Sequence, residues 1–254
     1  MGLAVSGGNL FVSNLDGDRI GEYTTFGAPV DSALITGLVG PRGLAVPGGN
    51  LFVASDNPTS ESSRIGKYTI SGATVNPALI QKGFFGFVEG IAVSGDKLFL
   101  ADLYSGLVAE YTTSGALMNA ALITGLNGPS GIAVFGGHLF VTNFGNGTVG
   151  EYDAATGAPI DTALVSGLNG PFGIAVSGGN LFVTSQVFGQ DTGTIGEYTI
   201  LGETVNTRLI TGLSEPVGIA VVSGSVPDAS STWTLLLMGL MVIFGINLVR
   251  HQLA

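Results

Sequence analysis

The 254-residue chain contains no cysteine and only two histidines. Without cysteine the chain forms no disulfide bond and no thiolate metal site. The sequence also offers no histidine pair at metal-ligand spacing, no Ser-His-Asp arrangement and no glycine-rich phosphate loop ahead of a helix. We therefore predict no catalytic residue, no metal and no cofactor, and we interpret His138 as a solvated turn residue.

Positive charge is also scarce. The chain has 8 Lys and Arg against 18 Asp and Glu, which gives a formal net charge of −10. A nucleic-acid-binding protein needs clustered basic residues to neutralise phosphates, and here the basic residues are scattered singly. The composition therefore argues against nucleic acid as a partner.

Glycine, in contrast, is abundant, with 42 residues where average usage is about 7 %. Much of it belongs to an internal repeat. The motif Gly-[Leu/Ile]-Ala-Val begins at six positions, which are Gly2, Gly43, Gly90, Gly131, Gly173 and Gly218. The spacings between these positions are 41, 47, 41, 42 and 45 residues. This period indicates an array of small units, none of which can bury its apolar face alone.

Each unit contains the same four short segments in the same order. In the first unit they are residues 2–5, 10–12, 19–24 and 33–36. Each is rich in β-branched and aromatic residues and is bounded by Gly, Asn, Asp or Pro, which are strand and turn signals, and none keeps a helical spacing. Four strands at this period predict one propeller blade. One phenylalanine recurs in the second strand of every unit and is expected to pack between blades, namely Phe11, Phe52, Phe99, Phe140 and Phe182.

The repeated sequence Gly-Pro-x-Gly-Ile-Ala-Val, Gly-Gly-Asn-Leu-Phe-Val and Ile-Gly-Glu-Tyr resembles the NHL-type repeat of β-propellers, over residues 2–217. We predict an all-β propeller of four-stranded antiparallel blades in one domain, residues 1–222. Its repeats are 2–42, 43–89, 90–130, 131–172 and 173–217, followed by a partial unit, 218–222, that supplies one extra inner strand. Relatives of this kind commonly have six blades, so the resemblance implies an N-terminally truncated six-bladed ring. A five-bladed ring with a spare strand is the alternative.

The C-terminal segment breaks the repeat pattern. After a linker at 223–232, residues 233–249 carry no charge and, at about 1.5 Å of helix rise per residue, are just long enough to span the hydrocarbon core of a bilayer. We predict a transmembrane helix at 233–249, a cytoplasmic tail at 250–254 and a propeller outside the membrane. The residues that support the span are Trp233 at an interface, Leu236, Leu240, Ile243 and Val249 within it, and Arg250 at its cytoplasmic end. A buried hairpin or helix within the domain is the alternative.

The order of Val226-Pro227-Asp228, hydrophobic span and terminal Arg250 resembles the PEP-CTERM class of bacterial sorting signals, in a variant with Val-Pro-Asp in place of Pro-Glu-Pro. The resemblance implies recognition by an exosortase-like enzyme, cleavage near the motif, and release or attachment at the cell surface, often beside exopolysaccharide. A plain tail anchor remains the alternative.

Two polar positions also recur in the repeats. The second strand closes on Asn14, Ser55, Asp102, Asn143 and Ser185, which we expect to cap turns. Of these, only Asn14, Asp102 and Asn143 are faint candidates for the axial metal ligands of a lactonase-like propeller. The third strand carries Glu22, Glu110, Glu151 and Glu197, with Lys67 in the second unit, and we expect these charges to be solvated.

Length variation is concentrated on one face of the expected ring. The loop between the second and third strands is four residues longer in the second and fifth units, and the link near residues 81–87 is also lengthened. This face carries aromatic residues suited to contact with sugar or protein, namely Phe85, Tyr104, Phe144, Phe172 and Phe188.

We therefore predict a non-enzymatic, exported propeller that serves as a binding or structural module at the cell surface or in the extracellular matrix, with an extracellular polysaccharide or protein as ligand. The alternative is a lactonase- or lyase-like propeller enzyme whose catalytic residues lie in a missing N-terminal blade.

Overall fold

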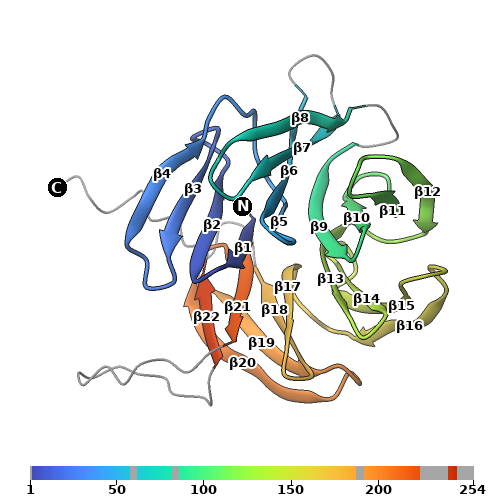
Figure 1. The fold of residues 1–254 in the computed structure, drawn as a ribbon. Helices are drawn as coiled ribbons and strands as arrows, with labels where there is room; N and C mark the ends of the chain where they lie inside the picture. The colour runs from blue at the N-terminus through green and yellow to red at the C-terminus, as the bar shows by residue number, and fades with distance from the viewer. Residues whose placement is uncertain (1, 58–61, 82–85, 187–191, 224–239, 245–254) are drawn as a thin grey trace, which may run out of the picture.

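The computed structural model describes residues 2–57, 62–81, 86–186, 192–223 and 240–244, and every regular element in these ranges is a β-strand. Five four-stranded antiparallel blades surround a central axis (Figure 1). The inner strands are β1 (Leu3–Ser6), β5 (Leu44–Ala45), β9 (Val88–Ser94), β13 (Pro129–Phe135) and β17 (Pro171–Ser177). The five complete blades predicted from the repeat are therefore confirmed.

The other three strands of each blade follow in chain order from the axis outward. The second strands are β2 (Asn9–Asn14), β6 (Asn50–Asp56), β10 (Lys97–Asp102), β14 (His138–Asn143) and β18 (Asn180–Ser185). The third strands are β3 (Arg19–Thr24), β7 (Ser63–Thr69), β11 (Leu107–Thr112), β15 (Thr148–Asp153) and β19 (Gly193–Thr199). The outer strands are β4 (Pro29–Ile35), β8 (Thr74–Ile80), β12 (Leu117–Ile123), β16 (Pro159–Val165) and β20 (Thr204–Leu213).

The repeated motifs explain why each unit folds in this way. Between β1 and β2 the paired residues Ser6 and Asn9 enclose Gly7 and Gly8, which have φ of 59° and 82°. Positive φ at both central residues is the requirement of a type I′ hairpin turn, and glycine meets it without strain. In the third strand, the tyrosine of Gly-x-Tyr lies across the glycine two residues before it, so the motif forms a small packing unit within one strand.

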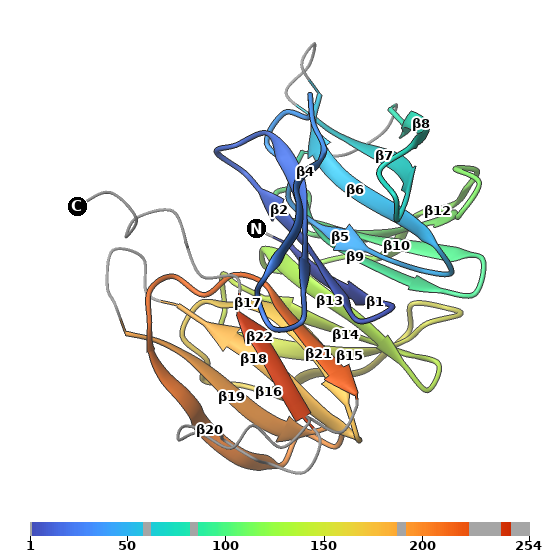
Figure 2. The ribbon, with the colours of Figure 1, turned by 60° about the vertical axis from the view of Figure 1, so that its left-hand side comes forward.

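A sixth inner position lies between the last and first blades. Strand β21 (Ile219–Ser223) packs against both β17 and β1, and it pairs antiparallel with β22 (Leu240–Phe244) (Figure 2). The additional inner strand expected at 218–222 is therefore present, and it is part of the ring instead of lying outside a closed five-membered one.

Most of the predicted C-terminal signal lies outside the described residues. This applies to the motif at 226–228, to Trp233, Leu236, Val249 and Arg250, and to the greater part of the span 233–249. The helix and the sorting signal therefore remain predictions, although Leu240–Phe244 of the span form β22. Within the described ranges, no helix has the length and apolar character needed to cross a bilayer.

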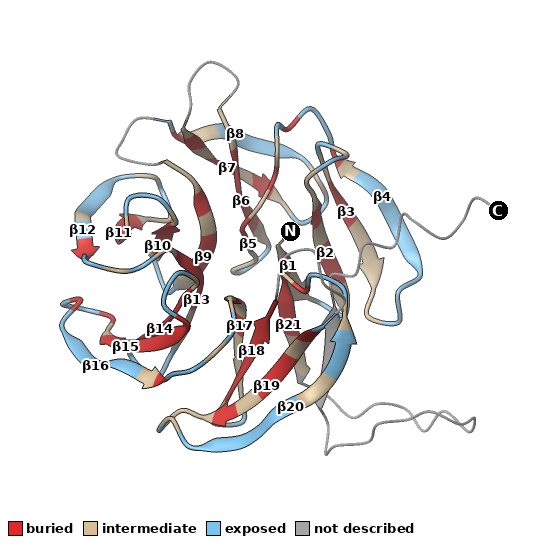
Figure 3. Cartoon of the chain, turned by 180° about the vertical axis from the view of Figure 1, so that it is seen from behind, coloured by how far each residue is buried: buried red, intermediate tan, exposed pale blue. Residues whose placement is uncertain are grey.

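The hydrophobic core is divided among the spaces between neighbouring blades. Phe11, Phe52, Phe99, Phe140 and Phe182 are each at most 1 % exposed, as predicted. Between blades 1 and 2, for example, Phe11 and Ile20 pack with Leu51, Val53 and Tyr68. Burial is deepest in the second strands, such as β18, and lowest in the outer strands, which are mostly exposed (Figure 3).

Two features hold successive inner strands close together. A Cβ added at Gly43 would lie 2.8 Å from the carbonyl oxygen of Glu89 in the next blade, so only glycine permits this approach; Gly2, Gly90, Gly131 and Gly173 face the next blade in the same way. The second feature is a bridging hydroxyl. Thr142 Oγ1 accepts a hydrogen bond from Gly131 N–H at 2.7 Å and donates one to the Phe172 carbonyl at 2.7 Å. Ser13 and Thr184 bridge their blades similarly, whereas blades 2 and 3 have alanine at this position.

Candidate functional site

One face of the ring carries the links between blades and the loops between second and third strands, and we call it the loop face. Backbone hydrogen bonds join each loop to the link that precedes its blade. Phe144 N–H donates to the Gly128 carbonyl at 2.9 Å, Leu103 N–H to Phe87 at 2.9 Å, and Gln186 N–H to Gly170 at 3.2 Å. The described parts of the loop face are thus connected to one another, while the lengthened parts at 58–61, 82–85 and 187–191 lie outside the described residues.

The loop face has two described aromatic pairs. The Tyr104 side chain is 72 % exposed and meets the Phe87 ring edge to face at 4.9 Å between centroids. Phe144 and Phe172 form a second edge-to-face pair at 6.1 Å. The other two aromatic residues expected on this face, Phe85 and Phe188, lie outside the described residues.

The strand-closing residues act as turn caps. The buried Asp102 carboxylate accepts hydrogen bonds from the backbone N–H groups of Gly86, Phe87, Tyr104 and Ser105 at 2.8–3.3 Å. Asn14 accepts from Gly17 N–H at 2.8 Å, and Asn143 donates to the Thr148 hydroxyl at 3.2 Å. Asn14 and Asn143 serve their own loops, and Asp102 also binds the link before its blade; the described part of the chain contains no cluster of three metal-ligating residues.

The third-strand charges are paired more closely than the sequence suggested. Each glutamate faces the residue that begins the second strand of its own blade. Glu110 Oε1 lies 2.6 Å from Lys97 Nζ and Glu151 Oε1 lies 2.7 Å from His138 Nδ1. Glu22 and Glu197 accept hydrogen bonds from Asn9 and Asn180 at 2.6 and 2.7 Å. The expectation of solvated glutamates is therefore wrong for Glu110 and Glu151, whose side chains are 5 % and 13 % exposed, whereas the His138 side chain is 42 % exposed and solvated as expected.

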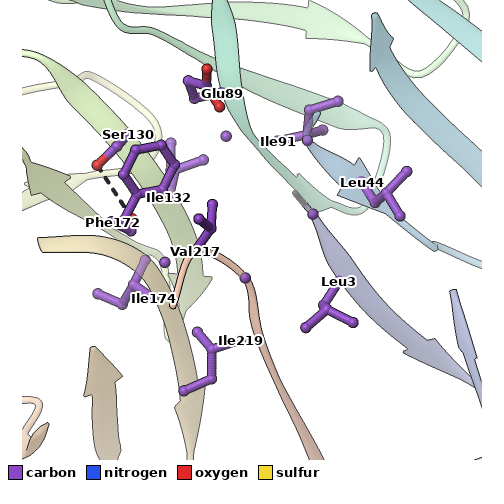
Figure 4. Close-up of a pocket in the computed structure, with 16 residues that line it drawn as sticks. Leu3, Leu44, Glu89, Ile91, Ser130, Ile132, Phe172, Ile174, Val217 and Ile219 are labelled. Carbon is purple, nitrogen blue, oxygen red and sulfur yellow. Dashed lines mark hydrogen bonds between the residues drawn. The ribbon is translucent and has the colours of Figure 1, made fainter. Parts of the chain in front are cut away.

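The axis itself is a narrow channel of about 80 Å³. The start of each inner strand contributes to its wall, including Glu89, Ser130, Phe172 and Val217 (Figure 4). Ligand pockets commonly occupy about 300–1,000 Å³. The channel is therefore too small for an organic ligand of ordinary size.

An ion-pair network lies at this mouth. Arg42 Nη1 lies 2.7 Å from Glu89 Oε1, Arg42 Nε lies 3.4 Å from Asp56 Oδ1, and the guanidinium lies 4.8 Å from the Phe87 ring centroid. Burial lowers the pKa of Arg42, but the charges of Glu89 and Asp56 and their hydrogen bonds outweigh burial and raise that pKa above its ordinary value. Arg42 is therefore charged at any physiological pH, and with two carboxylates the mouth carries one net negative charge.

Sequence reasoning missed this network, although the repeat contains a signal for it. The residue x before the glycine of x-Gly-[Leu/Ile]-Ala-Val differs in chemistry from unit to unit, whereas the residues that follow it hardly change. In the described units this residue is Arg42, Glu89, Ser130, Phe172 and Val217. Because this residue varies while the rest of the motif stays the same, packing between the blades does not determine which residue type occurs at this position.

A larger cavity of about 340 Å³ lies between blades 4 and 5, and we call it the blade 4–5 groove. Hydroxyl and amide side chains make up much of its wall, and none of its lining residues is charged. They are Leu164–Asn169, Ser185, Thr194, Tyr198, Gly202, Thr204 and Thr207. Gly170, the neighbour of Asn169, lies against the Phe144 ring, and neither Phe144 nor Phe172 lines the groove itself.

Comparison with known proteins supports the fold. No family model matches the sequence, and no curated protein gives a significant match. Among solved structures, the chain is similar to the propeller of a nidogen/laminin complex, with a TM-score of 0.70 and 18 % identity over 85 % of this chain and 82 % of the other. It is also similar to a catalytically inactive variant of virginiamycin B lyase from Staphylococcus aureus with quinupristin, with a TM-score of 0.63 and 21 % identity over 86 % and 72 % of the two chains.

A third similar structure is a gluconolactonase from Xanthomonas campestris, with a TM-score of 0.65 and 17 % identity over 84 % of this chain and 75 % of the other. These likenesses establish an NHL-like propeller fold. They also contradict the prediction that the chain is not an enzyme, because propellers of this architecture include a lyase and a lactonase. That prediction rested on absent catalytic motifs, and a propeller site assembles from single residues on separate blades, which leave no motif in the sequence.

Proposed function

We propose that this chain is an exported propeller of the cell surface or extracellular matrix that binds a saccharide in the blade 4–5 groove. The observation that carries the proposal is the composition of that groove. Its volume of about 340 Å³ lies within the range of small-molecule sites, and its wall combines hydroxyl and amide groups with no charged residue. A neutral, polyhydroxylated ligand matches such a wall, because each side supplies both donors and acceptors of hydrogen bonds.

The aromatic pair of Phe144 and Phe172 on the loop face supports the same ligand class. Phe144 and Phe172 are partly exposed, and aromatic rings beside polar groups suit contact with sugars. The nidogen structure is that of a complex with laminin, so a propeller of this architecture can also serve in binding.

Export is the second part of the proposal. Val226-Pro227-Asp228 and the apolar residues 233–249 would direct the chain to the membrane and to an exosortase-like enzyme, which would cleave near the motif. A helix of this hydrophobicity holds a chain in the bilayer nearly irreversibly, so release requires cleavage. Intact-mass measurement of protein from the surface or medium of the native host should show loss of the span. Released protein that still ends at Ala254 would contradict both the sorting signal and a tail anchor.

Saccharide binding can be tested by titration calorimetry with neutral oligosaccharides. Asn169→Ala and Thr207→Ala remove polar groups from the groove wall and should each weaken binding about fivefold or more, as expected when a hydrogen-bond partner is lost. Thr162→Ala is the matched control, because Thr162 is exposed on β16 outside the groove. Absence of binding, or equal affinity in all three variants, would contradict the proposal.

A lactonase- or lyase-like activity is the second candidate. It is favoured by Glu89, whose carboxylate is 6 % exposed and lies at the axial mouth, where it could act as an acid or base. Turnover of lactones or of cyclic depsipeptides, followed by mass spectrometry, tests this candidate. Glu89→Gln should abolish turnover while leaving saccharide binding in the groove unchanged.

A further inference from the structure

Three hydroxyl groups of blade 5 line one part of the blade 4–5 groove, which we call its hydroxyl end. They belong to Ser185, Thr194 and Tyr198. Ser185 closes the second strand and pairs with Thr194 at the start of the third strand. Tyr198 lies four residues after Thr194, so both side chains are on the same face of that strand, toward blade 4. Because the chain repeats, the other blades carry equivalent residues at the same kind of interface.

In blade 4 a carboxamide fills the equivalent space. Asn143, the counterpart of Ser185, is 2 % exposed, and its Nδ2 donates a hydrogen bond to Thr148 Oγ1 at 3.2 Å. Burial raises the pKa of Tyr152, and a hydrogen bond with the Asn143 side chain lowers it, so the same amide also meets the tyrosine hydroxyl. The threonine and tyrosine hydroxyls of this blade therefore share one side-chain amide as their partner.

Blades 2 and 3 fill this space with other polar side chains. Blade 2 also ends its second strand with a serine, Ser55, but Arg64 takes the paired position in the third strand and its Nε donates to Ser55 Oγ at 3.2 Å. In blade 3 the strand ends with Asp102, which is 0 % exposed. Among blades 2–5, only blade 5 has a short hydroxyl residue at both positions.

The exposure of these residues shows that two short side chains leave room at the hydroxyl end. Thr194 is partly exposed, whereas its counterpart Thr148 is buried. Ser185 is 9 % exposed, against 2 % for Asn143. The room corresponds to the amide that blade 4 has and blade 5 lacks. It is bordered by hydroxyl groups, each of which can both donate and accept a hydrogen bond.

We propose that the hydroxyl end of the groove binds the acetamido group of an N-acetylated amino sugar. This inference rests on the saccharide-binding function proposed above and names the class of sugar. The N–H of the ligand would donate to the hydroxyl oxygen of Thr194 or Tyr198, as Asn143 Nδ2 does in blade 4, and its carbonyl would accept from another hydroxyl. The sugar ring would then face the remaining polar wall at Asn169 and Thr207.

Two disaccharides that differ in this group test the proposal. N,N′-diacetylchitobiose carries acetamido groups where cellobiose carries hydroxyl groups, and the two sugars are otherwise the same. In titration calorimetry with the full-length chain, we expect diacetylchitobiose to bind at a ratio of one to one and at least about tenfold more tightly than cellobiose, which offers no amide to the hydroxyl end.

The outcomes separate this inference from the function on which it rests. Equal affinity for the two sugars would overturn the assignment of the acetamido group and leave saccharide binding in the groove in place. Binding of neither sugar would overturn the assignment, and absence of binding to every neutral oligosaccharide would also contradict the function itself.

A substitution that copies blade 4 into blade 5 locates the site. Ser185→Asn supplies the missing amide from within the chain, so it should weaken binding of diacetylchitobiose at least about tenfold. Ser32→Asn is the matched control, because Ser32 is exposed on β4 of blade 1, and it should leave the affinity unchanged. Unchanged affinity in Ser185→Asn would overturn the proposal.

The reciprocal substitution tests whether the missing amide creates the site. Asn143→Ser should open a second site between blades 3 and 4, where Asn127 and Thr162 occupy the positions that Asn169 and Thr207 have in the groove. The folded variant should therefore bind two molecules of diacetylchitobiose, and a ratio that stays at one would overturn the proposal. If Asn143→Ser fails to fold, Ser185→Asn and the pair of sugars decide the question.

Discussion

The interfaces between complete blades and the two interfaces beside β21 are built from the same residue types, yet they bury these residues to different extents. Val141 between blades 3 and 4 is fully buried, whereas its counterpart Val12 beside the sixth position is partly exposed. The repeat therefore encodes half of an interface, and the other half comes from the neighbouring unit. In such arrays stability is approximately a sum of unit and nearest-neighbour terms, so the blades next to the sixth position should be the weakest part of the ring.

The largest expected effect comes from truncation of the phenylalanine between two complete blades. Phe140→Ala should cost about 3–5 kcal/mol of unfolding free energy, because it removes a buried aromatic ring and leaves a cavity. Phe182 beside β21 is as deeply buried, at 1 % exposed, so Phe182→Ala should cost a similar amount. Reversible urea denaturation measures both. A loss below about 1 kcal/mol for Phe140→Ala would show that this core does not stabilise the ring.

A smaller pair of substitutions compares the two kinds of interface directly. Val141→Ala removes a fully buried side chain and should cost about 2 kcal/mol, whereas Val12→Ala should cost about half as much because its side chain is already partly hydrated. If urea denaturation showed equal losses of unfolding free energy for the two variants, the two side chains would not differ in burial as the structure indicates.

The bridging hydroxyls offer a polar version of the comparison. Thr142→Val keeps the shape of the side chain but leaves Gly131 N–H without its hydroxyl partner, and should cost about 1–3 kcal/mol. Thr162→Val on the exposed surface is the control and should change stability by less than about 0.5 kcal/mol. A neutral result for Thr142→Val would mean that this bridge is dispensable, as blades 2 and 3 already suggest by having alanine there.

The smallest expected effect is the dependence of stability on alkaline pH. Burial raises the pKa of Tyr68, Tyr111, Tyr152 and Tyr198 above the ordinary value. A raised pKa stabilises the folded state below the unfolded pKa of about 10, and this contribution is lost as pH rises through the folded value. The unfolding free energy of the wild-type protein should therefore fall above pH 10. The unfolding free energy of the Tyr152→Phe variant should fall less steeply with pH. If the unfolding free energies of the wild-type protein and of Tyr152→Phe fell equally steeply with pH, the buried Tyr152 hydroxyl would not be the cause of the pH dependence.

Much of the fold was predictable from the sequence because the repeat fixes it five times over. The spacing of Gly-[Leu/Ile]-Ala-Val predicted the number of complete blades. The alternating pattern of the second strand predicted that Phe140 and its counterparts are buried between blades. Cross-strand partners were not predictable, because the loop between second and third strands varies by four residues and leaves the register open. The pairing of His138 with Glu151 depends on that register.

The candidate sites were less predictable than the fold. Asp102 was correctly expected to cap a turn, whereas the role of Phe144 and Phe172 on a ligand-binding face remains a prediction. The ion pair of Arg42 and Glu89 joins residues 47 positions apart on different blades, so only the closed geometry of the ring brings them together. The blade 4–5 groove likewise arises from the space between two blades, which no single repeat describes.

The glycines that begin the inner strands also set the circumference of the ring. Each fixes the distance from one inner strand to the next, since an added Cβ would meet the next blade's backbone, as it would between Gly90 and the Ser130 carbonyl at 2.6 Å. An increase in one of these distances between inner strands must increase the circumference of the ring. The interfaces between complete blades are densely packed and resist such a change, so the added length would be taken up beside β21. The width of the sixth position therefore depends on glycines all around the axis, including Gly90 on its far side and Gly173 next to it.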